Sequence, residues 1–277
     1  MLLRYLKSYI CNSVAELRIK SKIEPKSNRK SKDMAQIGYG YGSEFQLMRF
    51  LGHHRNLLEK EIKKQIGIEG EIHWLDFGFS NSDSCVSGDD EIKGLNFLVN
   101  IPFVSDLEYM AADAEYYMYE INNQASWQCW DAVFTLNDTI YLVEAKAHVG
   151  ELSSGNETHG GVSANEIMRY MKEQLPEFNI TEEWMKDYYQ LGNRLATTAL
   201  LNRNGIKAKT LCLFFENGYR RKGRVNGKLT ILSDKDASRE DFEKAIKIEM
   251  DTLGISHEMV SHLMTPCVFI NANPNKK

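Results

Sequence analysis

The clearest pattern of apolar and polar positions lies between residues 130 and 146. Trp130–Leu136 and Thr139–Val143 are rich in aromatic and β-branched residues, and Asn137-Asp138 stands between them. Two such runs joined by a two-residue turn predict a β-hairpin. In a tight turn the last residue of the first strand faces the first residue of the second, so facing positions sum to 275.

Helical spacing and apolar runs predict elements over much of the rest of the chain. The expected helices cover residues 43–66, 163–175, 181–199 and 238–253, and further strands cover residues 207–216 and 267–271. The first helix is expected to begin with Ser43 as its cap and Gln46 as the capping-box partner. The last helix is expected to have Ser238 as its cap, with Asp241 following.

The order of these elements predicts an α/β fold with a central mixed β-sheet flanked by helices. Residues 67–125 are ambiguous, since they combine two candidate strands (71–77 and 95–103) with loops rich in Ser, Asp and Gly. This segment either completes the sheet or forms an insertion that selects the substrate. A long polar loop follows residue 146, which is a usual place for substrate contacts.

The predicted hairpin brings three charged side chains to one face. Asp131 faces Glu144 across the strands, and Lys146 emerges on the same face as Glu144 because side chains alternate along a strand. Facing residues have Cβ atoms roughly 5 Å apart, so two carboxylates there repel each other. Lys146 can supply part of the missing positive charge and a divalent metal the rest. A register slip of one residue would separate the pair.

The order Asp131, then Glu144-Ala145-Lys146 on the next strand, resembles the PD-(D/E)xK phosphodiesterase superfamily, which includes restriction-endonuclease-like and RecB-like nucleases. Trp130 stands where the motif has proline, a position that varies in the family. The resemblance implies an αβββαβ core with additional elements. It implies Asp131 and Glu144 as Mg²⁺ ligands, and Lys146 as a catalytic lysine near the attacking water or the developing negative charge. The Ala145 carbonyl and waters would complete the shell, with Mn²⁺ as a substitute ion.

Glu44 is a further candidate at the first position of the first predicted helix. It matches, by order and placement, a metal-facing glutamate that many superfamily members carry on a helix before the core strands. The alternative is that Glu44 only complements the helix dipole, a contribution of about 0.3–1 kcal/mol. Both interpretations stay open.

Three other polar residues are candidates for contacts with nucleic acid. His148 continues the alternation of Glu144 and Lys146, and it either reaches the site or marks an exposed strand end. Gln190 lies on the helix where RecB-like exonucleases carry Gln-x-x-x-Tyr, but Arg194 replaces the tyrosine. Gln190 and Arg194 share one helical face and can contact phosphate.

Composition narrows the class of protein. The 277 residues are 43% hydrophobic and 26% charged, which is typical of a soluble globular chain. No apolar run approaches the ~20 residues that span a bilayer, so no membrane contact is expected. Five scattered cysteines without a CxxC pair argue against a disulfide framework or a structural zinc site, and favour a reducing cytoplasm.

Basic residues cluster in two segments. Residues 1–33 hold nine Lys/Arg against three Asp/Glu. This segment is either a solvated extension or an arm that binds phosphate groups. Residues 34–277 are expected to form a single nuclease-like domain. Arg220, Arg221 and Lys222 lie in the second basic segment, 194–228, where interleaved glycines suggest an exposed loop that grips a nucleic-acid backbone. A solvated hairpin tip is the alternative.

Together these features predict a Mg²⁺-dependent nuclease, with DNA as the favoured substrate. One alternative is a nucleic-acid-binding module that keeps the fold without turnover. Another is a carboxylate-pair hydrolase such as a glycosidase, with Asp131 and Glu144 as the pair. The third alternative is that Glu144 and Lys146 form only a surface ion pair. The choice between DNA and RNA and the oligomeric state, homodimer included, stay open.

Overall fold

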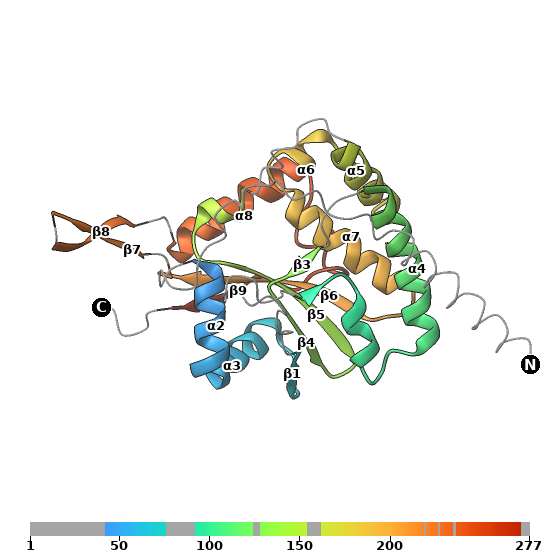
Figure 1. Ribbon diagram of the computed structural model, residues 1–277, viewed down its shortest axis with the longest axis horizontal. Coiled ribbons are helices and arrows are strands. Elements are labelled where there is room, and N and C mark those ends of the chain that lie inside the picture. Colours follow the sequence, from blue (N-terminus) through green and yellow to red (C-terminus); the bar gives the residue numbers. More distant parts are fainter. Residues whose placement is uncertain are drawn as a thin grey trace, which may run out of the picture. The chain divides into compact units, whose positions relative to one another are not determined.

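A computed structural model gives the architecture of the chain (Figure 1). It describes residues 42–75, 92–123, 128–153, 162–218, 220–226, 228–234 and 237–272. These residues belong to one compact unit that spans residues 35–277. The basic segment 1–33 lies outside the described residues, as do residues 76–91 and 124–125 of the ambiguous segment.

A mixed five-stranded sheet forms the centre of the fold, in the order β1-β4-β5-β6-β9. Its strands are β1 (Ile72–Trp74), β4 (Ala132–Leu136), β5 (Thr139–Lys146), β6 (Ala208–Glu216) and β9 (Val268–Asn271). The first three are antiparallel, whereas β6 is parallel to β5 and β9 is parallel to β6. The predicted α/β fold with a central mixed sheet is confirmed, and β1 shows that the ambiguous segment adds an edge strand.

The β4–β5 hairpin has the predicted register. Leu136 pairs with Thr139 and Ala132 pairs with Val143, as the tight turn requires. Asn137 adopts a φ of 56° in the turn, a left-handed conformation that asparagine tolerates better than most residues. Both strands are almost entirely buried. The residues flanking this ladder are therefore held in fixed positions.

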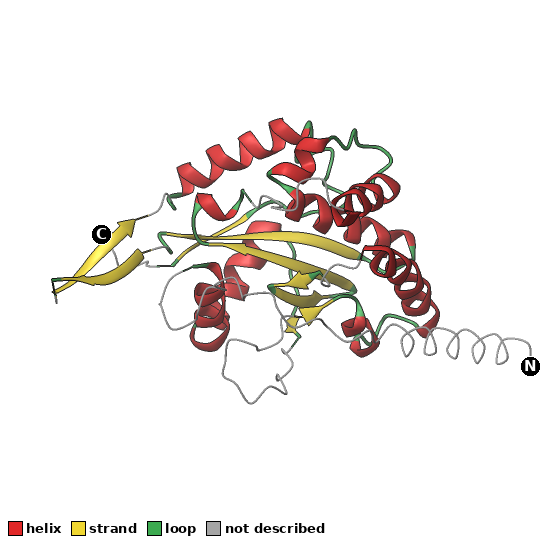
Figure 2. Cartoon of the chain, turned by 45° about the horizontal axis from the view of Figure 1, so that its top comes forward, coloured by secondary structure: helices red, strands yellow, loops and turns green. Residues whose placement is uncertain are grey.

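Helices cover both faces of the sheet (Figures 1 and 2). One face carries α2 (Ser43–His53) and α3 (Arg55–Ile66). The other carries α4 (Asp106–Asn123), α5 (Val162–Gln174), α6 (Glu182–Lys186), α7 (Tyr189–Arg203) and α8 (Arg239–Leu253). No helix among the described residues is long and apolar enough to cross a membrane.

Alternation along β5 divides the core into two parts. Tyr141, Val143 and Ala145 pack with α2 and α3, whereas Ile140 and Leu142 pack in the larger core that includes α7 and α8. Even-numbered positions of β5 therefore face α7 and α8. This places the side chains of Glu144 and Lys146 beneath those two helices.

Two predicted helices are interrupted. Residues 43–66 break at His54 into α2 and α3, and residues 181–199 break at residues 187–188 into α6 and α7. The apolar spacing of the first continues across its break because both halves contribute to one core. The predicted cap is also wrong, since Gly42 takes the N-cap position and Ser43 is already helical. The Gln46 side chain instead donates to the Gly218 carbonyl at 2.8 Å.

Two further predictions about local structure are wrong. Residues 95–103 contain the 3₁₀ helix η3 (Asn96–Asn100) instead of a strand. A short apolar run does not by itself distinguish a strand from a buried helical turn. The basic triplet Arg220–Lys222 lies in strand β7 (Arg220–Val225), which pairs with β8 (Lys228–Asp234), so it is not a loop. The sequence Asn226-Gly227 favours such a hairpin turn.

Other predicted elements are confirmed. The helix predicted for residues 163–175 is α5, which ends at residue 174. The strand predicted for residues 207–216 is β6, which begins at residue 208. Ser238 caps α8 in a full capping box with Asp241. Short strands β2 (Ile92–Lys93) and β3 (Cys129–Trp130) pair just before the hairpin, and η4 (Val149–Glu151) follows β5.

Candidate active site

Asp131 stands at the start of the hairpin, between β3 and β4. The ladder of β4 and β5 ends at the pair Ala132 and Val143, so Asp131 lies at the position that faces Glu144. Its Oδ2 accepts a hydrogen bond of 2.7 Å from the backbone N–H of Ala145. This contact fixes one carboxylate oxygen of Asp131 against β5 and brings the predicted pair together.

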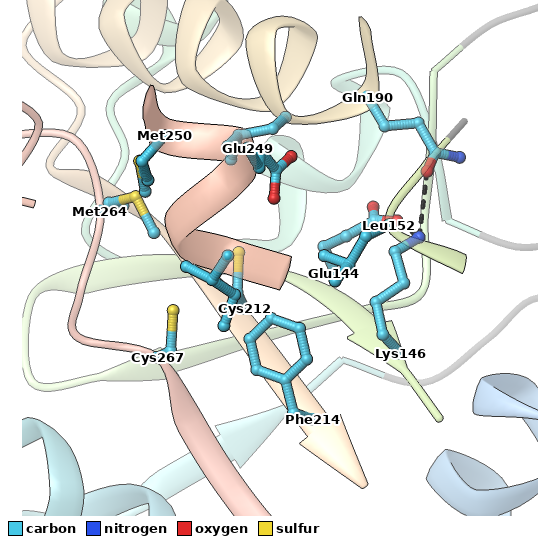
Figure 3. Close-up of a pocket in the computed structure, with 12 residues that line it drawn as sticks. Glu144, Lys146, Leu152, Gln190, Cys212, Phe214, Glu249, Met250, Met264 and Cys267 are labelled. Carbon is cyan, nitrogen blue, oxygen red and sulfur yellow. Dashed lines mark hydrogen bonds and ion pairs between the residues drawn. The ribbon is translucent and has the colours of Figure 1, made fainter. Parts of the chain in front are cut away.

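Glu144 is buried between two cations. Its Oε1 accepts a hydrogen bond of 2.5 Å from Lys146 Nζ, and its Oε2 accepts one of 2.8 Å from Arg194 Nε. Lys146 Nζ also donates to Gln190 Oε1 at 3.0 Å, which Figure 3 shows as a dashed line. The side chains of Glu144 and Arg194 are each 9% exposed, and that of Lys146 is 11% exposed. Glu144 and Lys146 therefore form a buried ion pair and not a surface ion pair.

Arg194 links the site to the strand before the hairpin. Its Nη2 donates to the Cys129 carbonyl at 2.5 Å, and its guanidinium carbon lies 4.6 Å from the centroid of the Trp130 ring. Stacking on an aromatic face is favourable for a guanidinium. The tryptophan that directly precedes Asp131 thus packs against the buried arginine of α7.

The two carboxyl groups differ in their protonation. Burial raises the pKa of Asp131 to about 7, and the negative charge of Glu144 adds to this rise. Burial would also raise the pKa of Glu144, but Lys146 and Arg194 outweigh it and lower that pKa to about 2. Of the two groups, Asp131 therefore takes up a proton more readily, and Glu144 stays ionised. A cation placed between them would favour the ionised form of Asp131.

A cavity adjoins this group of charges. It is lined by Glu144, Lys146, Leu152, Gln190, Leu191, Cys212, Phe214, Ile246, Glu249, Met250, Met264 and Cys267. Glu249 on α8 is 5% exposed, and its carboxyl points into the cavity (Figure 3). This carboxyl was not predicted from the sequence. Its burial could have been predicted, because position 249 falls on the same helical face as Phe242, Ile246 and Met250, which are buried.

Replacing Glu249 with glutamine should stabilise the protein at alkaline pH. Burial raises the pKa of Glu249 from 4.5 to about 8, so the folded state keeps a proton that the unfolded state releases between these values. Stability of the native protein therefore falls as the pH rises from 4.5 to 8. Glu249→Gln removes this loss, and we expect a gain on the order of 2–4 kcal/mol above pH 8. Urea unfolding at pH 5, 7 and 9 measures it, and Glu243→Gln, an exposed carboxyl on the same helix, is the control. A gain that is equal at all three pH values contradicts the assignment.

Two other predicted residues, Glu44 and His148, lie at the start of α2 and just after β5. Glu44 is exposed in the first turn of α2, on the face of the sheet opposite to Glu144, so its role in the site stays a prediction. His148 Nε2 lies 3.5 Å from Glu151 Oε1. Glu151, which the sequence analysis missed, also accepts a hydrogen bond of 2.6 Å from the Ala147 N–H and one of 3.4 Å from the Ser43 N–H. It joins the end of β5 to the start of α2.

The basic hairpin β7–β8 is described only in its backbone. The side chains of Arg220, Arg221 and Lys222 lie outside the described ones. Their predicted contact with nucleic acid therefore stays a prediction. The structure adds that the triplet lies on a β-strand, with a register irregularity between Arg221 and Lys222.

The donor oxygens suit one hard divalent ion. Among the described residues no group of three or more His, Cys, Asp or Glu side chains forms a metal-binding cluster. Mg²⁺ does not require such a cage, because one or two carboxylates commonly hold it with waters and substrate phosphate. Asp131 and Glu144 could provide that pair, and burial is the main cause that raises the pKa of Asp131 to about 7. The ion would share the Glu144 oxygens with Lys146 and Arg194.

Comparison with known proteins adds no identification. No family model, curated protein or solved structure matched the chain. The resemblance to the nuclease superfamily therefore depends on Asp131, Glu144 and Lys146 and on their setting. Conclusions about activity come from the chemistry of these side chains.

Proposed function

We propose that the protein is a metal-dependent phosphodiesterase that hydrolyses nucleic acid, with DNA as the favoured substrate. The observation that carries the proposal is the buried group formed by Asp131, Glu144 and Lys146 on a hairpin with the predicted register. Burying these charges is costly unless they are paired or bind a ligand. An acidic pair with an adjacent lysine is also the motif of the PD-(D/E)xK superfamily.

The strand order supports the same proposal. Helices α2 and α3 precede β1, an additional segment with α4 separates β1 from the hairpin of β4 and β5, and α5, α6 and α7 then lead into β6, which is parallel to β5. This is the order expected of the αβββαβ core of the superfamily. Asp131 directly precedes the second of these strands, and Glu144 and Lys146 lie on the third, which is the order that the resemblance implies.

The proposed mechanism assigns a task to each side chain. Asp131 and Glu144 would hold Mg²⁺, which when bound polarises a phosphoryl oxygen and lowers the pKa of a bound water. Lys146 orients the attacking water or offsets the negative charge that develops on the phosphate. Gln190 holds the Lys146 ammonium from the opposite side, at 3.0 Å. Arg194 fixes the second Glu144 oxygen and so sets the orientation of that carboxylate.

A nuclease assay tests the proposal directly. The purified chain is incubated with single- and double-stranded DNA and RNA in Mg²⁺, Mn²⁺ or EDTA, beside Glu144→Ala. The control is Glu243→Ala, which removes an exposed carboxylate that pairs with Arg239. Metal-dependent cleavage that is lost only in Glu144→Ala supports the enzyme. Hydrolysis of a polysaccharide in EDTA would instead favour the carboxylate-pair hydrolase.

A nucleic-acid-binding module without catalytic activity is the second candidate, and one observation favours it. Lys146 and Arg194 already provide two positive charges beside Glu144 and Asp131, so the site is charge-balanced without an added ion. In this case both the wild type and Glu144→Ala bind nucleic acid, and neither protein cleaves it. Binding without cleavage by the wild-type protein in Mg²⁺ and Mn²⁺ would replace the nuclease proposal with this one.

Metal binding gives a second, independent readout. We expect Asp131→Asn to weaken Mg²⁺ binding by at least about tenfold, because an amide oxygen lacks the charge of a carboxylate ligand. Isothermal titration calorimetry measures the affinity. Asp138→Asn is the matched control, since Asp138 is an exposed residue of the hairpin turn that pairs with Lys207. Equal affinity in Asp131→Asn and in the wild type would argue against a shared ion between the facing carboxylates.

A further inference from the structure

A pair of cysteines continues the row of polar side chains across the sheet. Glu144 on β5 is the register partner of Cys212 on β6. The next ladder begins at Leu213 and Val268, so Cys212 and Cys267 occupy neighbouring positions one step before it. Both are free thiols that line the cavity, and Figure 3 shows them projecting from the sheet on the side of α8.

The two thiols are in contact and differ in their surroundings. A side-chain hydrogen bond joins Cys212 and Cys267, and a second one joins Cys267 to the exposed His257. Cys212 is buried, whereas Cys267 is partly exposed. The hydrogen bonds from Cys212 and His257 lower the pKa of Cys267 to about 6. A partly exposed thiol of lowered pKa therefore lies beside a buried thiol.

We propose that Cys267 and Cys212 form a thiol-oxidation site, at which a hydroperoxide converts the two thiols into a disulfide on the floor of the cavity beside Glu144. The thiolate is the form of cysteine that attacks peroxides, which assigns the first step to Cys267. Cys212 has the place of the resolving cysteine. The cavity and the exposed edge at His257 give a small peroxide access to the first sulfur.

The chemistry balances without any further reactant. The Cys267 sulfur attacks one peroxide oxygen, the O–O bond breaks, and the departing oxygen takes a proton to leave as an alcohol or as water. Cys267 is then a sulfenic acid. The Cys212 sulfur attacks the Cys267 sulfur, the S–O bond breaks, and the hydroxide combines with the thiol proton to give water. The two sulfurs lose two electrons, which the peroxide gains.

Backbone geometry is compatible with the product. Neighbouring strands lie about 4.8 Å apart. This separation falls within the range of roughly 4.4–6.8 Å between the Cα atoms of disulfide-bonded cysteines. Cys267 also precedes the first residue of β9, so it is not held by the ladder itself.

Oxidation would alter the proposed active site, and this consequence depends on the proposed function. Cys212 packs directly beside Glu144, and the disulfide draws its sulfur toward Cys267 and away from that carboxylate. Nuclease activity is therefore expected to fall on oxidation and to return with a dithiol reductant. The disulfide itself is detected without any activity.

Mass spectrometry of the intact, folded chain after hydrogen peroxide treatment tests the proposal. We expect the wild type to lose two hydrogen atoms and to yield a linked peptide pair containing Cys212 and Cys267, reversed by dithiothreitol. Cys212→Ser should instead accumulate a sulfenic acid at Cys267 that is trapped by dimedone. Cys129→Ser, which removes a cysteine outside the pair, should behave as the wild type.

The rates decide the assignment. Cys267 is expected to react with peroxide at least about tenfold faster than Cys129, since the reaction follows the thiolate fraction and access. Equal rates at the two residues, or a pair that stays reduced while Cys129 oxidises, would overturn the proposal. If the disulfide forms in a chain that shows no nuclease activity, the thiol site stands and only the proposed function fails.

Discussion

Lys146→Met is expected to lower metal-dependent cleavage by about 10²–10³-fold, the usual effect of losing one group that stabilises transition-state charge. The Lys146 ammonium lies 2.5 Å from Glu144 Oε1 and 3.0 Å from Gln190 Oε1, so its position is fixed before substrate binds. Methionine occupies nearly the same volume but carries no charge and donates no hydrogen bond. The loss should therefore appear in kcat with little change in KM.

The fold should survive this substitution. Arg194 still neutralises Glu144 through its hydrogen bond of 2.8 Å, and Asp131 can keep its proton. No carboxylate is then left buried without a counter-charge. Lys247→Met is the matched control, because Lys247 is an exposed lysine on α8 that pairs with Asp251. Undiminished cleavage in folded Lys146→Met would remove the lysine from the mechanism.

The hairpin was predictable because its determinants are local. The turn residues Asn137 and Asp138 set the register, and the register alone brings Asp131 beside Glu144. Alternation then fixes the face of Lys146. The capping box of α8 is equally local, since its two members are three residues apart. Each of these features depends on neighbours in the sequence, which is why the pattern was sufficient.

The structural features that could not be predicted from the sequence depend on contacts between distant segments. The pairing of Glu144 with Cys212 is a register between β5 and β6, which a long crossover separates, and no local signal sets it. The breaks at His54 and at residues 187–188 keep the apolar spacing intact on both sides, so periodicity does not reveal them. Glu249 was not singled out from the sequence, although it lies on the buried face of α8.

Arg194 is the residue whose loss should destabilise the fold most among the polar groups of the site. It was first considered only for contact with phosphate, but it is buried and its partners are Glu144, the Cys129 carbonyl and the Trp130 ring. Arg194→Met leaves the Glu144 carboxylate with Lys146 alone and leaves the carbonyl without this donor. Breaking a buried ion pair on one side typically costs about 3–5 kcal/mol, and we expect a loss of that size in urea unfolding.

Two further variants separate charge from geometry at this position. Arg169→Met removes an exposed arginine that pairs with Glu166 and Glu173 on α5, and it should cost only about 0.2–1 kcal/mol. Arg194→Lys keeps the charge but cannot donate to Glu144 and Cys129 at once, so an intermediate loss is expected. A loss in Arg194→Met no larger than that in Arg169→Met would mean that Lys146 alone neutralises Glu144. Arg194 would then be available for a phosphate, because the fold would not depend on its pairing.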